Sequence, residues 1–184
     1  MLMQPDQSDL FGNGPNAANL LPSGDRAYNL RVFARDGQGS PAEKAVNFLE
    51  SLKIPQGKNS GQAVRLAPFQ RQFVTGALGD DIAAAVLSIG RGNAKTALSS
   101  GIALGGLLGI WDRQPRREVL IAARTRDQGR VAWDFVAGFC ESLPLEIKRK
   151  LIYRRAPRLE IEYEGDGGGH VLRVLAADGK SALG

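Results

Sequence analysis

The segment Ser88-Ile-Gly-Arg-Gly-Asn-Ala-Lys-Thr-Ala-Leu98 decides which fold we expect. It follows an apolar run, Ile82 to Leu87, which is short and bounded enough to predict a buried strand. It leads into a run from Lys95 to Leu108 that is apolar almost all round, as in a helix buried against a sheet. The sequence therefore predicts a strand, a glycine-rich turn and a helix in succession.

A glycine-rich turn that ends in Lys-Thr between a strand and a helix is the context of a phosphate-binding loop. Its backbone N–H groups would form a concave nest for phosphate oxygens at the positive end of the helix dipole. The residues of this nest are Gly90, Arg91, Gly92, Asn93, Ala94 and Lys95. Lys95 would neutralise the β- and γ-phosphates, and the Thr96 hydroxyl would bind Mg²⁺. The expected ligands are ATP and Mg²⁺.

The loop departs from the general pattern G-x-x-x-x-G-K-[ST], because Ile89 and Ala94 occupy its two defining glycine positions. If the second position requires a positive φ, alanine there costs about 1 kcal/mol or more. The alternative interpretation is an ordinary turn between a strand and a helix, with Lys95 and Thr96 as surface residues.

Arg91-Gly-Asn-Ala-Lys-Thr96 resembles the deviant Walker A of phage large terminase subunits, the ATPases that pump DNA into empty capsids. Residues 66–79 resemble the segment ahead of that loop, whose Pro-aromatic-Gln contributes adenine recognition. The resemblance thus implies that Gln70 contacts adenine. Residues 121–130 resemble the second strand and the following helix start, and residues 172–184 extend the likeness more weakly. The resemblance covers roughly residues 40–184 in order.

This resemblance implies an α/β fold like that of P-loop NTPases, with a mainly parallel core sheet flanked by helices. A C-terminal antiparallel hairpin or sheet extension is expected as well. Arg91 and Lys95 would serve catalysis. The implied partners are double-stranded DNA, the portal protein, the small terminase subunit and further copies of the chain in a homo-oligomeric ring. The implied location is the cytoplasm of the bacterial host.

The acidic half of such an ATPase site is missing from the sequence. After Thr96, no apolar strand ends in Asp followed by Glu, as a Walker B requires. We therefore expect an incomplete ATPase domain, without Walker B or nuclease domain, that binds nucleotide with negligible hydrolysis. Two other readings stay open: a P-loop ATPase of helicase or DNA-repair type, and a basic adaptor for DNA or a portal whose phosphate loop is degenerate.

Local signals predict the remaining elements. Residues 1–39 are rich in Gly, Asn, Asp, Ser and Pro and predict a flexible tail, so the domain would span residues 40–184. The predicted helices span residues 42–52, 68–78 and 127–143, and the predicted strands span residues 118–123, 159–163 and 170–177. Ser40, Pro41 and Glu43 predict a capping box on the first helix. In the second helix Phe69, Phe73, Val74 and Leu78 would face the core, which would direct Gln70 elsewhere.

Composition and net charge say little about which partners the chain binds. The net charge of +5 and the pI near 9.7 are compatible with an anionic partner without specifying it. Basic residues are densest from Ile147 to Arg158, where they would contact DNA phosphates, contact a neighbouring subunit's nucleotide, or form a solvated face. The single Cys140 is expected to be a core residue. No apolar stretch is long enough for a bilayer, so no membrane partner is expected.

Overall fold

The computed structural model describes residues 39–79, 81–155 and 158–176. The chain divides into two compact units, Met1–Lys95 and Thr96–Gly184. Residues 1–38 of the predicted tail lie outside the described residues, as does residue 177 of the last predicted strand. The boundary between the units falls at the start of helix α4 (Lys95–Leu108).

The first unit contains helices α2 (Pro41–Ser51) and α3 (Pro68–Ala77), which pack against each other. The predicted capping box of α2 is confirmed: the Glu43 N–H donates to the Ser40 hydroxyl at 3.2 Å, and the Ser40 N–H donates to the Glu43 carboxylate at 2.8 Å. The core of this unit is formed by fully or almost fully buried side chains, namely Ala45, Phe48, Leu49, Leu52 and Val74. An ion pair between Arg71 and Glu50, at 2.6 Å, joins the two helices at their surface.

The segment Ile82–Leu87 is not the buried strand that its apolar sequence predicts. It has no regular secondary structure, and Val86 is 89% exposed. Among the described residues, none of its backbone groups pairs with a strand. A strand requires hydrogen-bonded pairing of its N–H and C=O groups with a second strand, so an apolar sequence alone does not make this segment a strand.

The second unit contains a four-stranded sheet in the order β1-β4-β3-β2. Its strands are β1 (Glu118–Ala123), β2 (Leu151–Arg154), β3 (Glu160–Tyr163) and β4 (His170–Ala176). Strands β1 and β4 are parallel, whereas β4 pairs with β3 and β3 with β2 in antiparallel fashion. The predicted C-terminal hairpin is confirmed, but the prediction of a mainly parallel sheet is wrong for the described residues. Short connections between β2, β3 and β4 permit only antiparallel neighbours, since a parallel pair needs a long crossover.

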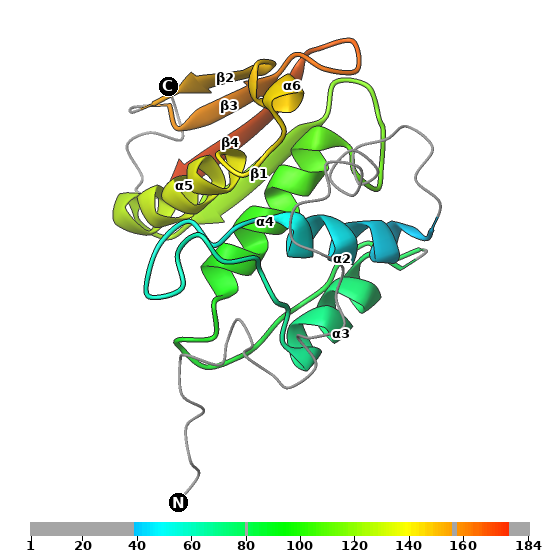
Figure 1. Ribbon diagram of the computed structural model, residues 1–184, viewed down its shortest axis with the longest axis vertical. Helices are drawn as coiled ribbons and strands as arrows, with labels where there is room; N and C mark the ends of the chain where they lie inside the picture. Colours follow the sequence, from blue (N-terminus) through cyan, green and yellow to red (C-terminus); the bar gives the residue numbers. More distant parts are fainter. Residues whose placement is uncertain (1–38, 80, 156–157, 177–184) are drawn as a thin grey trace, which may run out of the picture. The chain divides into compact units, whose positions relative to one another are not determined.

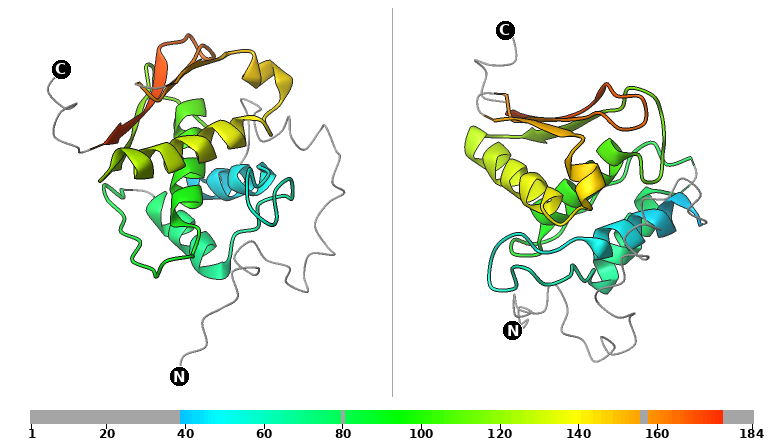
Figure 2. Two further views of the ribbon diagram at one scale, coloured as in Figure 1. Left: turned by 90° about the vertical axis from the view of Figure 1, so that its left-hand side faces the viewer. Right: turned by 45° about the horizontal axis from the view of Figure 1, so that its top comes forward.

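Helices α4 and α5 (Arg126–Cys140) pack on the same face of this sheet (Figures 1 and 2). The Cα of Gly106 in α4 approaches Val119 so closely that an added Cβ would lie 3.4 Å from it. A Cβ on Gly129 in α5 would lie 3.3 Å from Val174 of β4. The Ser100 hydroxyl of α4 donates to a backbone carbonyl of α5, that of Ala132, at 3.1 Å. A short helix, α6 (Leu145–Lys148), leads from α5 to β2.

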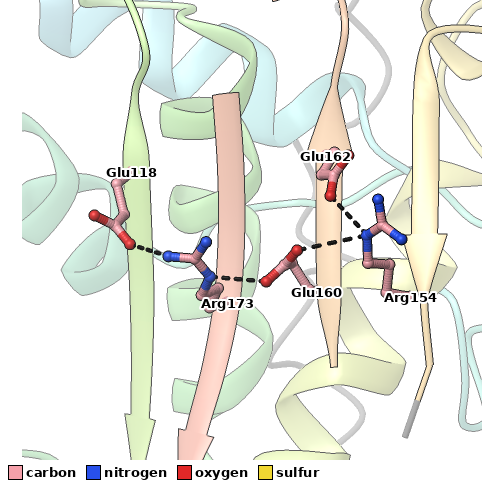
Figure 3. A network of polar contacts seen from close by, with 5 residues as sticks. All are labelled: Glu118, Arg154, Glu160, Glu162 and Arg173. Atoms are coloured by element: carbon pink, nitrogen blue, oxygen red, sulfur yellow. Dashed lines mark hydrogen bonds and ion pairs between the residues drawn. The ribbon is translucent and has the colours of Figure 1, made fainter. Parts of the chain in front are cut away.

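The opposite face of the sheet is exposed in part. Leu120 and Leu175 point to this side, with 54% and 47% of their surface accessible. Beside them, five charged side chains from all four strands form a network, namely Glu118, Arg154, Glu160, Glu162 and Arg173 (Figure 3). At its centre Arg173 donates to Glu160 at 2.7 Å and also to Glu118. Opposite charges directly across neighbouring strands thus stabilise the register of the sheet.

Candidate functional site

The predicted phosphate loop forms a tight turn that leads directly into α4. Two of its residues have positive φ angles, Gly92 at 82° and Ala94 at 50°. For glycine this region is freely accessible, whereas for alanine it is strained because Cβ crowds the following carbonyl. The second defining glycine position of the motif therefore does need the left-handed conformation, and alanine adopts it here at a cost.

The backbone N–H groups of this loop have no hydrogen-bond partner among the described residues. Within the part of the chain that the structure describes, no hydrogen bond engages the N–H groups of Gly90 through Ala94. The hydrogen bonds that stabilise the turn use its carbonyl oxygens: the Asn93 side-chain amide donates to the Gly90 and Arg91 carbonyls at 3.2 and 3.5 Å. Unengaged N–H groups ahead of a helix are the donors that bind an anion in a nest.

The Lys95 side chain is exposed but folds back over the loop. Its ammonium donates to the carbonyl oxygens of Ile89 and Gly90, the latter at 3.1 Å. The cation therefore lies beside the turn whose amides are unengaged. Thr96 follows as the second residue of α4 and is partly buried. Arg91 is exposed, and its side chain has no hydrogen bond or ion pair with any other described residue.

Gln70 lies where the sequence did not predict it. Its side chain is 1% exposed and faces inward, not away from the core as expected from the apolar positions of α3. Its carbonyl oxygen accepts from the Ala67 N–H at 3.0 Å, and its amide nitrogen donates to the Asn93 carbonyl at 3.4 Å. Contact between Gln70 and adenine stays a prediction.

A local sequence signal for this inward orientation was available. Gln70 is the third residue of α3, after Ala67 as N-cap and Pro68 at the first position. A glutamine at the third helical position commonly bonds back to the N-cap N–H, which turns it toward the helix start. The bond to Asn93, in contrast, joins residues 23 apart and has no signature in the sequence.

The described residues contain no group of three or more His, Cys, Asp and Glu side chains that could hold a metal ion. The hydroxyl of Thr96 is the Mg²⁺ ligand that the motif predicts, and one hydroxyl fits a magnesium ion that keeps several waters and binds chiefly through nucleotide phosphates. That role stays a prediction.

The basic cluster at residues 147–158 is partly neutralised within the fold. Arg154 bonds to Glu162 at 2.6 Å, which raises the pKa of Arg154 and lowers that of Glu162. Lys148 lies 3.4 Å from the Glu141 carboxylate. The exposed basic residues that remain in this cluster are Arg149, Lys150, Arg155 and Arg158. Contact of this cluster with DNA stays a prediction.

Two other chemically capable side chains are structural. Cys140 is fully buried, as expected for a core residue, and burial raises its pKa to about 12. His170 is 1% exposed, and its Nδ1 accepts from the backbone N–H of Arg117 at 3.1 Å. This bond ties the start of β4 to the residue before β1. Neither side chain is available to a substrate in solution.

Two of three comparisons with known proteins found a relative of this chain. No protein-family model matches the chain. The large terminase subunit of Enterobacteria phage HK97 is 35% identical to it over 97 residues. The crystal structure of the HK97 bacteriophage large terminase superposes with a TM-score of 0.60 and 25% sequence identity, over 79% of this chain. The chain is homologous to part of the HK97 large terminase.

The homology spans a limited share of that terminase. The aligned sequence is 50% of this chain and 19% of the curated relative, and the structural match covers 29% of the solved terminase. The α/β arrangement of this chain, with its four-stranded mixed sheet, thus matches part of the solved terminase structure. Among the described residues, no helix is long and apolar enough to cross a membrane.

Proposed function

We propose that this chain is the ATP-binding part of a viral DNA-packaging terminase large subunit, with an incomplete ATPase domain of the P-loop type. The observation that supports it most is the row of N–H groups from Gly90 to Ala94, which no described residue engages and which lie at the start of α4 and beside the Lys95 ammonium. Such a turn binds phosphate through main-chain dipoles and one cation. Homology with the HK97 large terminase supports the choice of a packaging ATPase over other nucleotide-binding proteins.

In this proposal each side chain of the loop has a separate task. The Lys95 ammonium exchanges the carbonyls of Ile89 and Gly90 for the β- and γ-phosphates, which are stronger acceptors because they are charged. The Thr96 hydroxyl binds Mg²⁺. Arg91 approaches the γ-phosphate, and its exposed guanidinium needs to break no bond to a described residue in order to do so.

The activity of the whole protein is part of the same proposal. The full-length form would hydrolyse ATP to translocate double-stranded DNA into a prohead, as a homo-oligomeric ring that contacts a portal protein and a small terminase subunit in the host cytoplasm. The carboxylates that orient the attacking water and complete the Mg²⁺ site would come from sequence other than these residues, since no Asp-Glu strand follows Thr96.

Thermal unfolding with and without Mg-ATP tests the binding step. Ligand at 100 times its Kd should stabilise the chain by about 2.7 kcal/mol. Lys95→Ala should remove this stabilisation, whereas Lys58→Ala, at an exposed loop lysine in the same unit, should preserve it. If wild type shows no shift, the proposal is wrong and the basic adaptor with a degenerate loop becomes the better explanation. If both variants keep the shift, the nucleotide binds without Lys95 and the proposed role of this loop is wrong.

The proposed role of Arg91 is tested by comparing the affinities for ATP and ADP. If Arg91 contacts the γ-phosphate, Arg91→Ala should weaken ATP binding several-fold and leave ADP binding nearly unchanged, because a charge-assisted contact is lost only for the triphosphate. Equal weakening for both nucleotides would assign Arg91 to the shape of the loop instead.

A further inference from the structure

The phosphate loop is tied to helix α3 by a buried amide. Gln70 is 1% exposed, and its Nε2 donates to the Asn93 carbonyl at 3.4 Å. Asn93 immediately precedes the strained Ala94 and, through its own side chain, closes the turn on Gly90 and Arg91. One side chain of α3 thus reaches the residue that determines the form of the turn.

The other end of the same amide is bonded to α3 itself. The Gln70 Oε1 accepts from the Ala67 N–H at 3.0 Å, so the side chain is oriented by its own helix start. A buried amide seeks partners at both ends because an unpaired polar group is unfavourable away from water. With one end bonded to the helix start, the other end is aimed at Asn93.

We infer that Gln70 is a positioning residue, which holds the phosphate loop in its phosphate-accepting form through the Asn93 carbonyl. This inference rests on the proposed function, since it names what shapes the same loop. It differs from adenine contact, because nearly all of the Gln70 surface is buried and one donor and one acceptor of its amide are already engaged within the chain.

Two substitutions at Gln70 distinguish the hydrogen bond of its carbonyl oxygen from that of its amide nitrogen. Gln70→Met has a similar length and loses both bonds. Gln70→Glu keeps an acceptor for the Ala67 N–H and loses the donor to Asn93. Arg71→Met is the matched control on the next residue, since it breaks only the ion pair with Glu50.

The first measurement needs no ligand. Order parameters from ¹⁵N relaxation should fall at residues 90–94 in both Gln70 variants, from the rigid range toward about 0.6, and stay unchanged in Arg71→Met. Order parameters of α2 should stay constant in all three variants, which distinguishes a local effect from general unfolding. If the loop is as rigid in Gln70→Met and Gln70→Glu as in wild type, the inference is overturned.

The second measurement compares Mg²⁺-inorganic triphosphate with Mg-ATP. A positioning role predicts that Gln70→Met weakens both ligands by the same factor, about three- to tenfold, as for one net hydrogen bond. Loss of ATP affinity with unchanged triphosphate affinity would overturn it in favour of base recognition. If wild type binds neither ligand, the proposed function fails, whereas the order parameters still decide whether Gln70 holds the loop.

Discussion

Replacing Ala94 by glycine should stabilise this protein, although glycine usually destabilises when it replaces alanine. Ala94 has a φ of 50°, within the left-handed region, and it occupies the second defining glycine position of the phosphate-binding motif. The substitution removes the Cβ that conflicts with this backbone conformation. The change in the free energy of unfolding therefore has the opposite sign to that of a typical Ala→Gly substitution.

The magnitude follows from two opposing terms. The left-handed conformation costs an L-residue about 1–2 kcal/mol, which Ala94→Gly recovers. The greater conformational freedom of glycine stabilises the unfolded chain and so lowers the free energy of unfolding by about 0.5–1 kcal/mol. The expected net gain is about 0.5–1 kcal/mol, or roughly 1–4 °C in Tm for a chain of this size.

The assay is urea unfolding followed by circular dichroism, with Ala137→Gly as the control. Ala137 is a half-buried residue in the interior of α5, where its helical backbone suits alanine. There the same chemical change should destabilise by about 1 kcal/mol or more. The two variants should therefore differ by about 1.5–2 kcal/mol, with opposite signs relative to wild type.

Destabilisation by Ala94→Gly as large as that by Ala137→Gly would show that the backbone of Ala94 is not strained. A third variant, Ala94→Val, checks the cause, because a branched side chain at positive φ is more strained than alanine and should destabilise further. Affinity for Mg-ATP should not fall in Ala94→Gly, since glycine lets the backbone approach a phosphate at least as closely.

Three further outcomes are expected. In Gly109→Ala the new Cβ would lie 2.7 Å from Cζ of the buried Arg117 guanidinium, at a φ of 69°, so the free energy of unfolding in urea should fall by about 2 kcal/mol or more. Gly57→Ala, at a φ of 93° with no atom of the described residues near the new Cβ, should lower it by only about 1 kcal/mol. Equal losses in the two variants would contradict the clash. The pKa of the Cys140 thiol is raised to about 12, so the folded state keeps a proton that the unfolded chain releases near pH 8.5; stability should decline as pH rises above about 8.5, and Cys140→Ala should remove that part of the slope. Phosphate release from Mg-ATP by these 184 residues should be negligible, and robust turnover abolished by Lys95→Ala would show this expectation to be wrong.

Elements with local signals were predicted closely. The capping box at Ser40 and Glu43 places the start of α2, and the apolar run up to Leu108 predicts the whole of α4. Strand β1 was predicted with its observed bounds, because an apolar run between a basic turn and an Arg-Thr pair has clear ends. Helix α5 ends at Cys140, before the predicted end at residue 143, where the chain turns toward α6.

Pairing between strands was predicted less well. Strand β2 lies within a basic segment whose charges dominate its sequence, and it exists because β3 offers its edge: Arg154 opposes Glu160 across the pair. Residues 82–87 have the more strand-like sequence, yet they pair with no strand among the described residues. A hydrogen-bonded ladder is a property of two segments, so the sequence of one segment does not decide it.

The sequence by itself determined the turn at Gly90–Thr96, the helix that follows, and the conflict between alanine and a glycine position, because these depend on residues within a few positions of one another. Only the tertiary structure decided that Gln70 faces the loop and bonds to Asn93, and that the sheet has one parallel and two antiparallel pairs. The physical reason is that a buried amide or a strand edge finds its partner in whatever segment packing brings near. That partner can lie 23 residues away, as Asn93 does from Gln70.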